Sequence, residues 1–161
     1  MKAKGFTLIE ILVVIAIISI LAAGVMPLTR MTVKRAKEME LRAGLRVLRS
    51  AIDAFKKDCD DNKLAKLEAY CDSARNNYPE SLEKLTEPLK LAGAVDRTKK
   101  YLRRLPRDPM TPLDSPENPN NWGLRSYGDD RDSTSWGGDN VYDVYSKSEA
   151  LSLDGSKYNT W

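Results

Sequence analysis

The chain has 161 residues, of which 42% are hydrophobic and 30% charged, and its formal net charge at pH 7 is +3. This charge is too balanced to indicate nucleic acid or anionic lipid as the main partner, and the length leaves room for one small soluble domain beyond an apolar N-terminal segment. The chain has no histidine, which is the most frequent general base in enzymes and a common metal ligand.

The first predicted element is a long apolar helix close to the N-terminus. The segment GFTLIEILVVIAIISILAAGVMP covers residues 5–27, and Glu10 is its one charged residue. A helix over this run is roughly 30 Å long, about the thickness of the hydrocarbon core of a bilayer. Lys2 and Lys4 precede the run and favour a cytoplasmic N-terminus. We therefore expect a single membrane-spanning helix.

Two ordinary explanations for this run leave Glu10 unexplained. A secretory signal has a shorter apolar region that ends at a small-residue cleavage site, which the letters LAAG imitate. A plain membrane anchor has no need of a carboxylate, which costs on the order of 3 kcal/mol at the centre of a lone membrane helix and less near the interface. A third possibility is that the Glu10 side chain reaches the lipid–water interface. The run contains no Lys or Arg to pair with this carboxylate.

The segment KGFTLIEILVVIAIISILAAGVMP resembles the N-terminus of type IV pilins and of type II secretion pseudopilins. The resemblance implies that a prepilin peptidase cuts after Gly5 and that the new N-terminal residue, Phe6, is methylated. It also implies that Glu10 neutralises the N-terminal amine of a neighbouring subunit in a filament, and that Pro27 bends the helix. Opposite charges attract strongly at low dielectric, whereas either charge alone is penalised, so Glu10 is expected to set the register between subunits.

After Leu28 the helical pattern continues and becomes amphipathic. Apolar residues recur at steps of three and four and form one stripe: Leu41, Leu45, Leu48, Ile52 and Phe55. We expect one helix from Phe6 to about Lys57. Its weak point is expected between Gly24 and Pro27, because both residue types disfavour helix.

The expected organisation has three parts. Residues 1–5 form a cleaved leader, residues 6–27 form the transmembrane or filament-core half of the helix, and residues 28–161 form a periplasmic head that includes the second half of the helix. The apolar stripe of that second half is expected to face the rest of the head.

Two cysteines, Cys59 and Cys71, follow the helix and enclose the segment DDNKLAKLEAY. Disulfides persist outside the cytoplasm, where this part of the chain is expected to lie, and the spacing is compatible with one bridge that contributes about 2–4 kcal/mol at most. Free buried thiols are the alternative. A metal site here is not expected, because two thiols without histidine are too few ligands.

A short helix and a proline-rich link are expected in the middle of the chain. The helix begins at Pro79 and ends at Pro88. Its apolar side carries Leu82, Leu85 and Leu89. The segments YPESLEKL and KYLRRLPRDPMTP (residues 100–112) resemble the middle region of major pseudopilins. The arginines of the second segment are interpreted as solvated or ion-paired rather than as a nucleic-acid site.

The C-terminal third is rich in turn residues and predicts short strands joined by loops. WGLRSY (residues 122–127) and NVYDVYS (residues 140–146) alternate apolar or aromatic with polar residues and are expected to be strands. We expect Trp122, Tyr142 and Val144 to be buried. The predicted fold is α+β: a long N-terminal α-helix packed under a small antiparallel β-sheet, followed by a loop-rich C-terminal tail.

The last segment, YDVYSKSEALSLDGSKYNTW, resembles the C-terminal tail of major pseudopilins, which commonly holds a calcium ion. The resemblance implies calcium ligands at Ser148 and Asp154 and at the backbone carbonyls of Leu151 and Leu153, because calcium prefers hard oxygen donors. The segment after the predicted strand has only two acids, Glu149 and Asp154, fewer than the tails of many pseudopilins. Further oxygen donors are Ser146 and Ser152. An Asp-Gly turn without an ion is the alternative.

The sequence predicts a structural protein and not an enzyme. It has no histidine, its cysteines are better explained by pairing, and no Gly-rich loop follows a strand and opens a helix. The expected function is that of a structural subunit of a pseudopilus filament that drives protein export through a type II secretion system. Expected partners are further copies in a helical filament, minor pseudopilins, a prepilin peptidase, the inner-membrane assembly platform, and membrane lipid before assembly; nucleic acid is not among them.

The expected location is the bacterial inner membrane, crossed once, with the head in the periplasm and with later assembly into a periplasmic filament. Two alternative functions remain open at this point. One is a subunit of a surface type IV pilus, and the other is a membrane-anchored periplasmic binding module.

Overall fold

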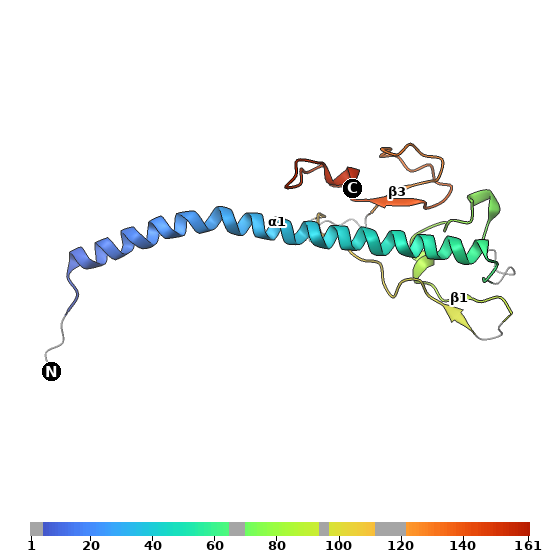
Figure 1. Cartoon of the computed structure of the whole chain (residues 1–161), viewed down its shortest axis with the longest axis horizontal. Coiled ribbons are helices and arrows are strands. Elements are labelled where there is room, and N and C mark those ends of the chain that lie inside the picture. The colour runs from blue at the N-terminus through green and yellow to red at the C-terminus, as the bar shows by residue number, and fades with distance from the viewer. Residues whose placement is uncertain (1–4, 65–69, 94–96, 112–121) are drawn as a thin grey trace. The chain divides into compact units, whose positions relative to one another are not determined.

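The computed structural model describes residues 5–64, 70–93, 97–111 and 122–161. Helix α1 runs from Leu8 to Asp60 and belongs to both of the compact units into which the chain divides, residues 1–36 and residues 37–161 (Figure 1). This boundary reflects packing within the chain. The expected division after residue 27 concerns the membrane and stays a prediction.

In the first unit, α1 presents apolar side chains that nothing in the described chain covers. Residues from Leu8 to Leu28 include a long series of exposed Ile, Leu and Val side chains. By length and composition, this part of α1 is suited to crossing a membrane. The helix continues without a break through residues 24–27, where a weak point was expected. The exposed apolar surface therefore extends along an uninterrupted helix.

The C-terminal end of α1 is closed by a local hydrogen-bond motif. Asn62 adopts a left-handed conformation with φ of 52°. Its amide donates to the carbonyl oxygen of Cys59 (3.0 Å), and the amide of Lys63 donates to that of Asp58 (2.8 Å). This pair of bonds is the Schellman motif, which satisfies carbonyl groups left without partners at a helix end. The helix stops at Asp60 for this local reason.

The second unit is built on the apolar stripe of α1. All five predicted stripe residues are buried. Ala51, which lies between two of them in the sequence, and Cys59, which follows the last of them, are buried as well. Trp122, Val144 and Tyr158 from the C-terminal part pack against the same core as Leu85 from the middle of the chain. Burial of such side chains contributes about 1.5–3 kcal/mol each. The predicted stripe is therefore the centre of the core of the head.

Two small antiparallel sheets accompany the helix, where one was expected. Strand β1 (Leu89–Lys90) pairs with β2 (Thr98–Lys99), and β3 (Gly123–Arg125) pairs with β4 (Asp143–Tyr145). Figure 1 shows β1 and β3 on different sides of α1. The second sheet has the predicted strands in shortened form, with Leu124 opposite Val144. The first sheet was missed because its strands are only two residues long and carry no periodic signal.

Short helical turns complete the head. They are the 3-10 helices η2 (Ser73–Arg75), η3 (Glu83–Thr86) and η4 (Tyr158–Thr160). The expected helix after Pro79 is thus a single 3-10 turn, and the leucines predicted on its apolar side are buried. Trp122 and Val144 are also buried, as expected. Tyr142 is 45% exposed, so its predicted burial was wrong.

Candidate functional site

The N-terminal end of α1 carries the residues expected to direct processing. Gly5, Phe6 and Thr7 lie outside the helix, so the bond between Gly5 and Phe6 is in non-helical backbone. The side chain of Phe6 is 79% exposed, and a Cβ placed on Gly5 would meet no other atom within 4 Å. Within the described residues, this bond is therefore free of packing that would hinder a peptidase.

Thr7 caps the helix that follows. The backbone amide of Glu10 donates to the Thr7 carbonyl oxygen (3.1 Å), and its distance to Thr7 Oγ1 is 3.3 Å. The spacing Thr-x-x-Glu is that of a capping box, in which the first residue satisfies a free amide of the first turn. Thr7 was missed as a functional residue, although this spacing was visible in the sequence. It gives α1 a defined start two residues after Phe6.

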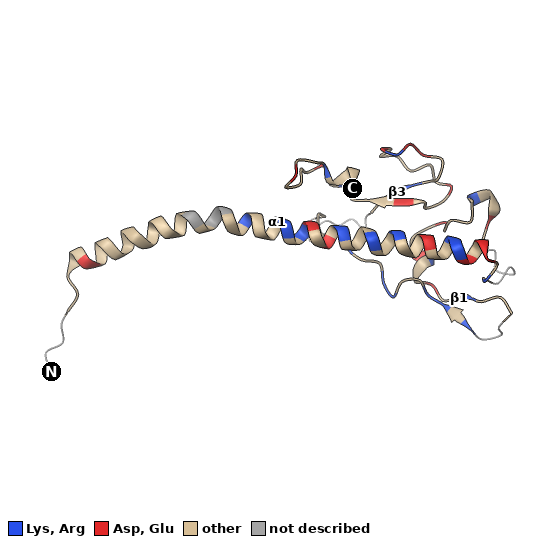
Figure 2. Ribbon diagram, in the orientation of Figure 1, with Lys and Arg blue, Asp and Glu red and all other residues tan. Residues whose placement is uncertain are grey.

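Glu10 lies in the first turn of α1 and is exposed. Figure 2 shows acidic colouring at the start of α1, and the sequence has no charged residue from Ile11 to Thr29. Among the residues that the structure describes, no Lys or Arg forms an ion pair with it. A carboxylate near a helix N-terminus is favoured by the helix dipole, but that effect leaves its charge without a counter-ion. The predicted partner, an amine of another subunit, lies outside this chain. Pro27 lies inside α1.

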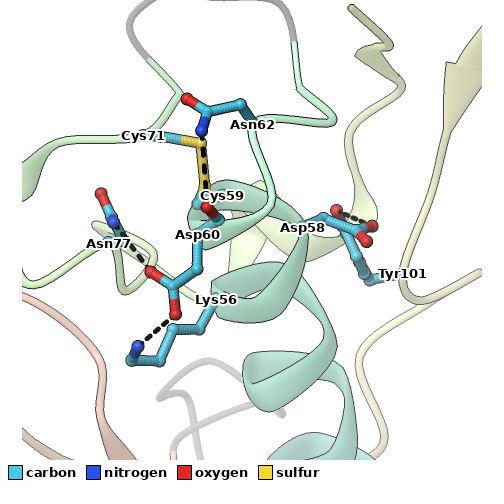
Figure 3. Close-up of a disulfide and its surroundings, with 8 residues drawn as sticks. All are labelled: Lys56, Asp58, Cys59, Asp60, Asn62, Cys71, Asn77 and Tyr101. Carbon is cyan, nitrogen blue, oxygen red and sulfur yellow. Dashed lines mark hydrogen bonds and ion pairs between the residues drawn. A yellow bond between two sulfur atoms is a disulfide. The ribbon is translucent and has the colours of Figure 1, made fainter.

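The C-terminal end of α1 is joined to the segment that follows it by a disulfide and by Asp60 (Figure 3). Cys59 and Cys71 form a disulfide with a Cα–Cα distance of 5.4 Å. Asp60 accepts hydrogen bonds from Lys56 (2.6 Å) and from Asn77 (2.9 Å). The disulfide and the bond from Asn77 fasten the last turn of the helix to the segment that leads into Tyr78 and Pro79.

Asp58, also in the last turns of α1, contacts the segment around residues 99–101. It is buried, and it accepts hydrogen bonds from the Lys99 ammonium and from the Tyr101 hydroxyl (2.8 Å). Burial by itself raises the pKa of the Asp58 carboxyl, but the bonds from Lys99 and Tyr101 outweigh it, so the net pKa is lowered. Burial, and then the bond to Asp58, raise the pKa of Tyr101. Asp58 thus stays ionised and Tyr101 protonated near neutral pH.

The C-terminal tail contains a tight turn around Asp154. Asp154 Oδ1 accepts hydrogen bonds from the hydroxyl of Ser152, from the amide of Ser156 (2.9 Å) and from the hydroxyl of Ser156 (2.6 Å). The bonds from Ser152 and then Ser156 lower the pKa of the Asp154 carboxyl to about 2. Gly155 has φ of 88°, a conformation that glycine adopts without strain. This is the Asp-Gly turn that was the alternative to an ion site.

The residues expected to bind calcium make contacts within the chain. Ser148 donates its amide to Ser146 Oγ, Leu151 forms a β-bridge with Lys157, and the Leu153 amide donates to a carboxylate on α1. Among the described residues, no group of three or more acidic, His or Cys side chains lies together. Asp154 supplies one carboxylate, and its Oδ1 already accepts three hydrogen bonds. One carboxylate with an occupied Oδ1 supplies few of the six to eight oxygens that a calcium ion takes. Calcium binding at Ser148, Leu151, Leu153 and Asp154 stays a prediction.

Glu38 holds the tail and was missed. Its side chain is buried, and Oε1 accepts hydrogen bonds from the Leu153 amide (2.8 Å) and from the Tyr158 hydroxyl (2.8 Å). Glu38 lies three residues before Leu41 and so continues the apolar stripe by one step. An acid at a stripe position was the signal that this carboxylate is buried and has partners.

Arg49 contacts both the second sheet and the tail. Its guanidinium donates to both carboxylate oxygens of Asp143 (2.7 and 3.3 Å), to the Val144 carbonyl (3.1 Å) and to the main-chain oxygen of Trp161 (2.9 Å). Such a forked contact to a carboxylate is geometrically specific to arginine. Arg49 lies outside the predicted apolar stripe, and periodicity alone could not show that a distant segment covers it.

The chain is similar to known proteins in its N-terminal segment and over a longer alignment. Residues 1–26 match the family model of the prokaryotic N-terminal methylation motif. The chain is 32% identical over 113 residues to type II secretion system core protein G of Escherichia coli, with 67% of each chain covered. It is 28% identical over 113 residues to the protein of that name from Klebsiella pneumoniae (67% of this chain, 69% of the relative). It is 30% identical over 109 residues to the one from Vibrio cholerae (67% and 66%). No solved structure matches the chain.

Proposed function

Because the chain belongs to the type II secretion system core protein G family of pseudopilins, we propose that it is the structural subunit of a pseudopilus filament that drives protein export through a type II secretion system. Its role is then structural and not enzymatic. The observation that carries the proposal is the start of α1, where a solitary carboxylate stands at the head of an exposed apolar helix directly after Gly5 and Phe6.

The exposed apolar surface of α1 is suited first to a lipid bilayer and later to a filament core. Such a surface is not stable in water and needs either lipid or like helices around it. Before assembly, the first half of α1 spans the inner membrane and the head lies in the periplasm. After assembly, the same half packs among the helices of neighbouring subunits in the core of a periplasmic filament.

Glu10 favours one register between neighbouring subunits in this packing. A prepilin peptidase cuts between Gly5 and Phe6, and the resulting amine of Phe6 stays cationic after methylation. When a subunit joins the filament, this amine and the Glu10 carboxylate of a neighbour neutralise each other in surroundings of low dielectric. A subunit out of register leaves both charges buried and unpaired, which is strongly unfavourable. Pro27 bends the helix at the end of the half that packs in the filament core.

The partners follow from these steps. They are the prepilin peptidase, further copies of this chain, minor pseudopilins, and the inner-membrane platform that extracts subunits from the lipid. The whole sequence of steps uses the apolar half of α1 and leaves the head on the outside of the filament.

The proposal is tested by Glu10→Gln in full-length protein produced with the secretion genes of its host. We expect N-terminal cleavage and methylation to proceed as in the wild type, because the bond after Gly5 is unchanged. We expect filament yield, counted by electron microscopy, to fall at least tenfold. The matched control is Glu83→Gln, which removes one negative charge from an exposed head position.

Three outcomes contradict the proposal. Filaments assembled by the Glu10→Gln protein at normal yield exclude the charge-pairing step. A wild-type chain that remains a monomer in the presence of the complete machinery favours the membrane-anchored binding module. Long extracellular fibres that form without any secretion genes favour a surface type IV pilus.

A further inference from the structure

We propose that the C-terminal tail of this chain is held on α1 by a metal-independent clasp made of side chains, with Glu38 as its anchor. The clasp consists of Glu38, Arg42 and Arg49 on α1 together with the tail residues Leu153, Asp154, Ser156, Tyr158 and Trp161. It concerns the stability of the head and does not depend on the proposed filament role.

Glu38 makes the first half of the clasp. Glu38 is only 6% exposed, and its Oε1 accepts hydrogen bonds from the Leu153 amide and from the Tyr158 hydroxyl, both at 2.8 Å. Burying a carboxylate is unfavourable unless donors satisfy its oxygens, and these two bonds supply such donors. The two bonds pin the tail at two points, on either side of the Asp154 turn.

Tyr158 is suited to this contact throughout the neutral range. Burial, and then the bond to Glu38, raise the pKa of the Tyr158 hydroxyl to about 12. The hydroxyl therefore remains protonated, and able to donate, at neutral pH. The Tyr158 ring is also buried, and it packs edge-on against Trp161 with ring centroids 5.1 Å apart.

Asp154 closes its turn without help from outside the chain. Three donors from Ser152 and Ser156 occupy Oδ1, and the Arg42 guanidinium lies 3.8 Å from Oδ2. A calcium ion takes one or two oxygens of a carboxylate as ligands. Here the nearest positive charge comes from the helix itself. The turn has the donors it needs before any ion is added.

The arginines of α1 hold the far end of the tail. The Arg42 guanidinium lies over the Trp161 ring, 4.3 Å from its centroid, and Arg49 donates to the Trp161 main-chain oxygen. Trp161 Nε1 donates to Ser156 Oγ (2.7 Å), and Ser156 is itself bonded to Asp154, so Trp161 is linked to the Asp154 turn. An acid and two arginines of one helix thus bind the backbone, a carboxylate and an aromatic ring of the tail.

The experiment measures amide hydrogen exchange of residues 146–161 in the full-length chain in detergent, with 1 mM calcium or with excess chelator. We expect tail exchange rates to agree within about twofold between the two conditions. Tyr158→Phe removes one donor while keeping the ring, and we expect it to speed exchange of the tail by about tenfold, since hydrogen bonds to charged groups are strong. Tyr142→Phe, at an exposed tyrosine, is the control and should leave tail exchange unchanged.

Glu38→Gln provides a second variant that keeps the size of the side chain. It should also speed tail exchange by about tenfold or more, in calcium and in chelator alike. Slowing of tail exchange by calcium of more than about tenfold, or one calcium ion retained per purified chain, overturns the proposal in favour of an ion site. Unchanged tail exchange in both Tyr158→Phe and Glu38→Gln overturns it as well, because the clasp would then not hold the tail.

Discussion

The carboxylate of Glu38 accepts a hydrogen bond from the hydroxyl of Tyr158 at 2.8 Å, across 120 positions of the chain. Glu38 lies at the beginning of the head and Tyr158 near the end of the tail. This bond therefore joins the first and last parts of the compact unit formed by residues 37–161. Trp161, three residues after Tyr158, makes a further contact with α1, because the Arg42 guanidinium lies over its ring.

The bond between Gly5 and Phe6 is expected to be cut in the cell. The mature chain should begin at Phe6 and carry one added methyl group, because the bond lies in exposed, non-helical backbone before the cap at Thr7. Mass spectrometry of the N-terminal peptide measures this. A mature chain that starts at Met1, or at a residue after Ala22 or Ala23, would contradict the prediction, the latter by indicating an ordinary signal peptide.

Removing the disulfide is expected to weaken the head. Cys59→Ala together with Cys71→Ala should lower the free energy of unfolding by about 2–4 kcal/mol, since the bridge closes a short loop of the unfolded chain. Denaturant unfolding followed by tryptophan fluorescence measures the change. Wild-type protein unfolded under reducing conditions is the control and should match the double variant. Two titratable thiols in unreduced wild-type protein would show that the bridge does not form.

Gly123→Ala is expected to destabilise the second sheet. A Cβ at this position would lie 2.2 Å from the Tyr145 ring, so the ring must move out of its place over β3. Crowding of this kind costs about 1–3 kcal/mol, measured by the same unfolding experiment. Gly128→Ala is the matched control, because a Cβ there meets no atom within 4 Å. Equal stability of the two variants would mean that Tyr145 has room to move.

Acid is expected to loosen the tail through Asp154. The folded-state pKa of Asp154 is lowered from 3.8 to about 2, first by the Ser152 bond and then by those from Ser156. A lowered pKa stabilises the folded form above the unfolded-state pKa, and this contribution is lost as pH falls from about 4 toward about 2. Tail hydrogen exchange as a function of pH, corrected for the intrinsic exchange rate, measures the loss.

Asp154→Asn separates this effect from that of other acids. The variant should show faster tail exchange at pH 6 and a smaller further increase between pH 4 and pH 2 than the wild type. Asp132→Asn, at an exposed acid of the loop before β4, should behave as the wild type. An identical acid response in wild type and Asp154→Asn would show that the Asp154 turn does not contribute to holding the tail.

Several features were predictable because their signals are local. The apolar run, the acid at its start and the leucine stripe from Leu41 to Phe55 all follow from the spacing of neighbouring residues. The Thr-x-x-Glu cap and the Asp-Gly turn are also local, because each depends on side chains within four residues of one another. These patterns are sufficient for one long helix, for its membrane-suited half and for the face that becomes the core.

Other features depend on segments that are distant in the chain. The burial of Glu38, the contacts of Arg49 with Asp143 and Trp161, and the exposure of Tyr142 depend on which segments meet, and separations of 94 to 120 residues leave no periodic trace. The strands are two or three residues long, too short for alternation to identify them. The sequence by itself therefore determined the helix and its apolar faces, since those arise from short-range spacing. Only the tertiary structure decided how the tail closes on α1, because a buried carboxylate such as Glu38 is stable only where the fold brings donors to it.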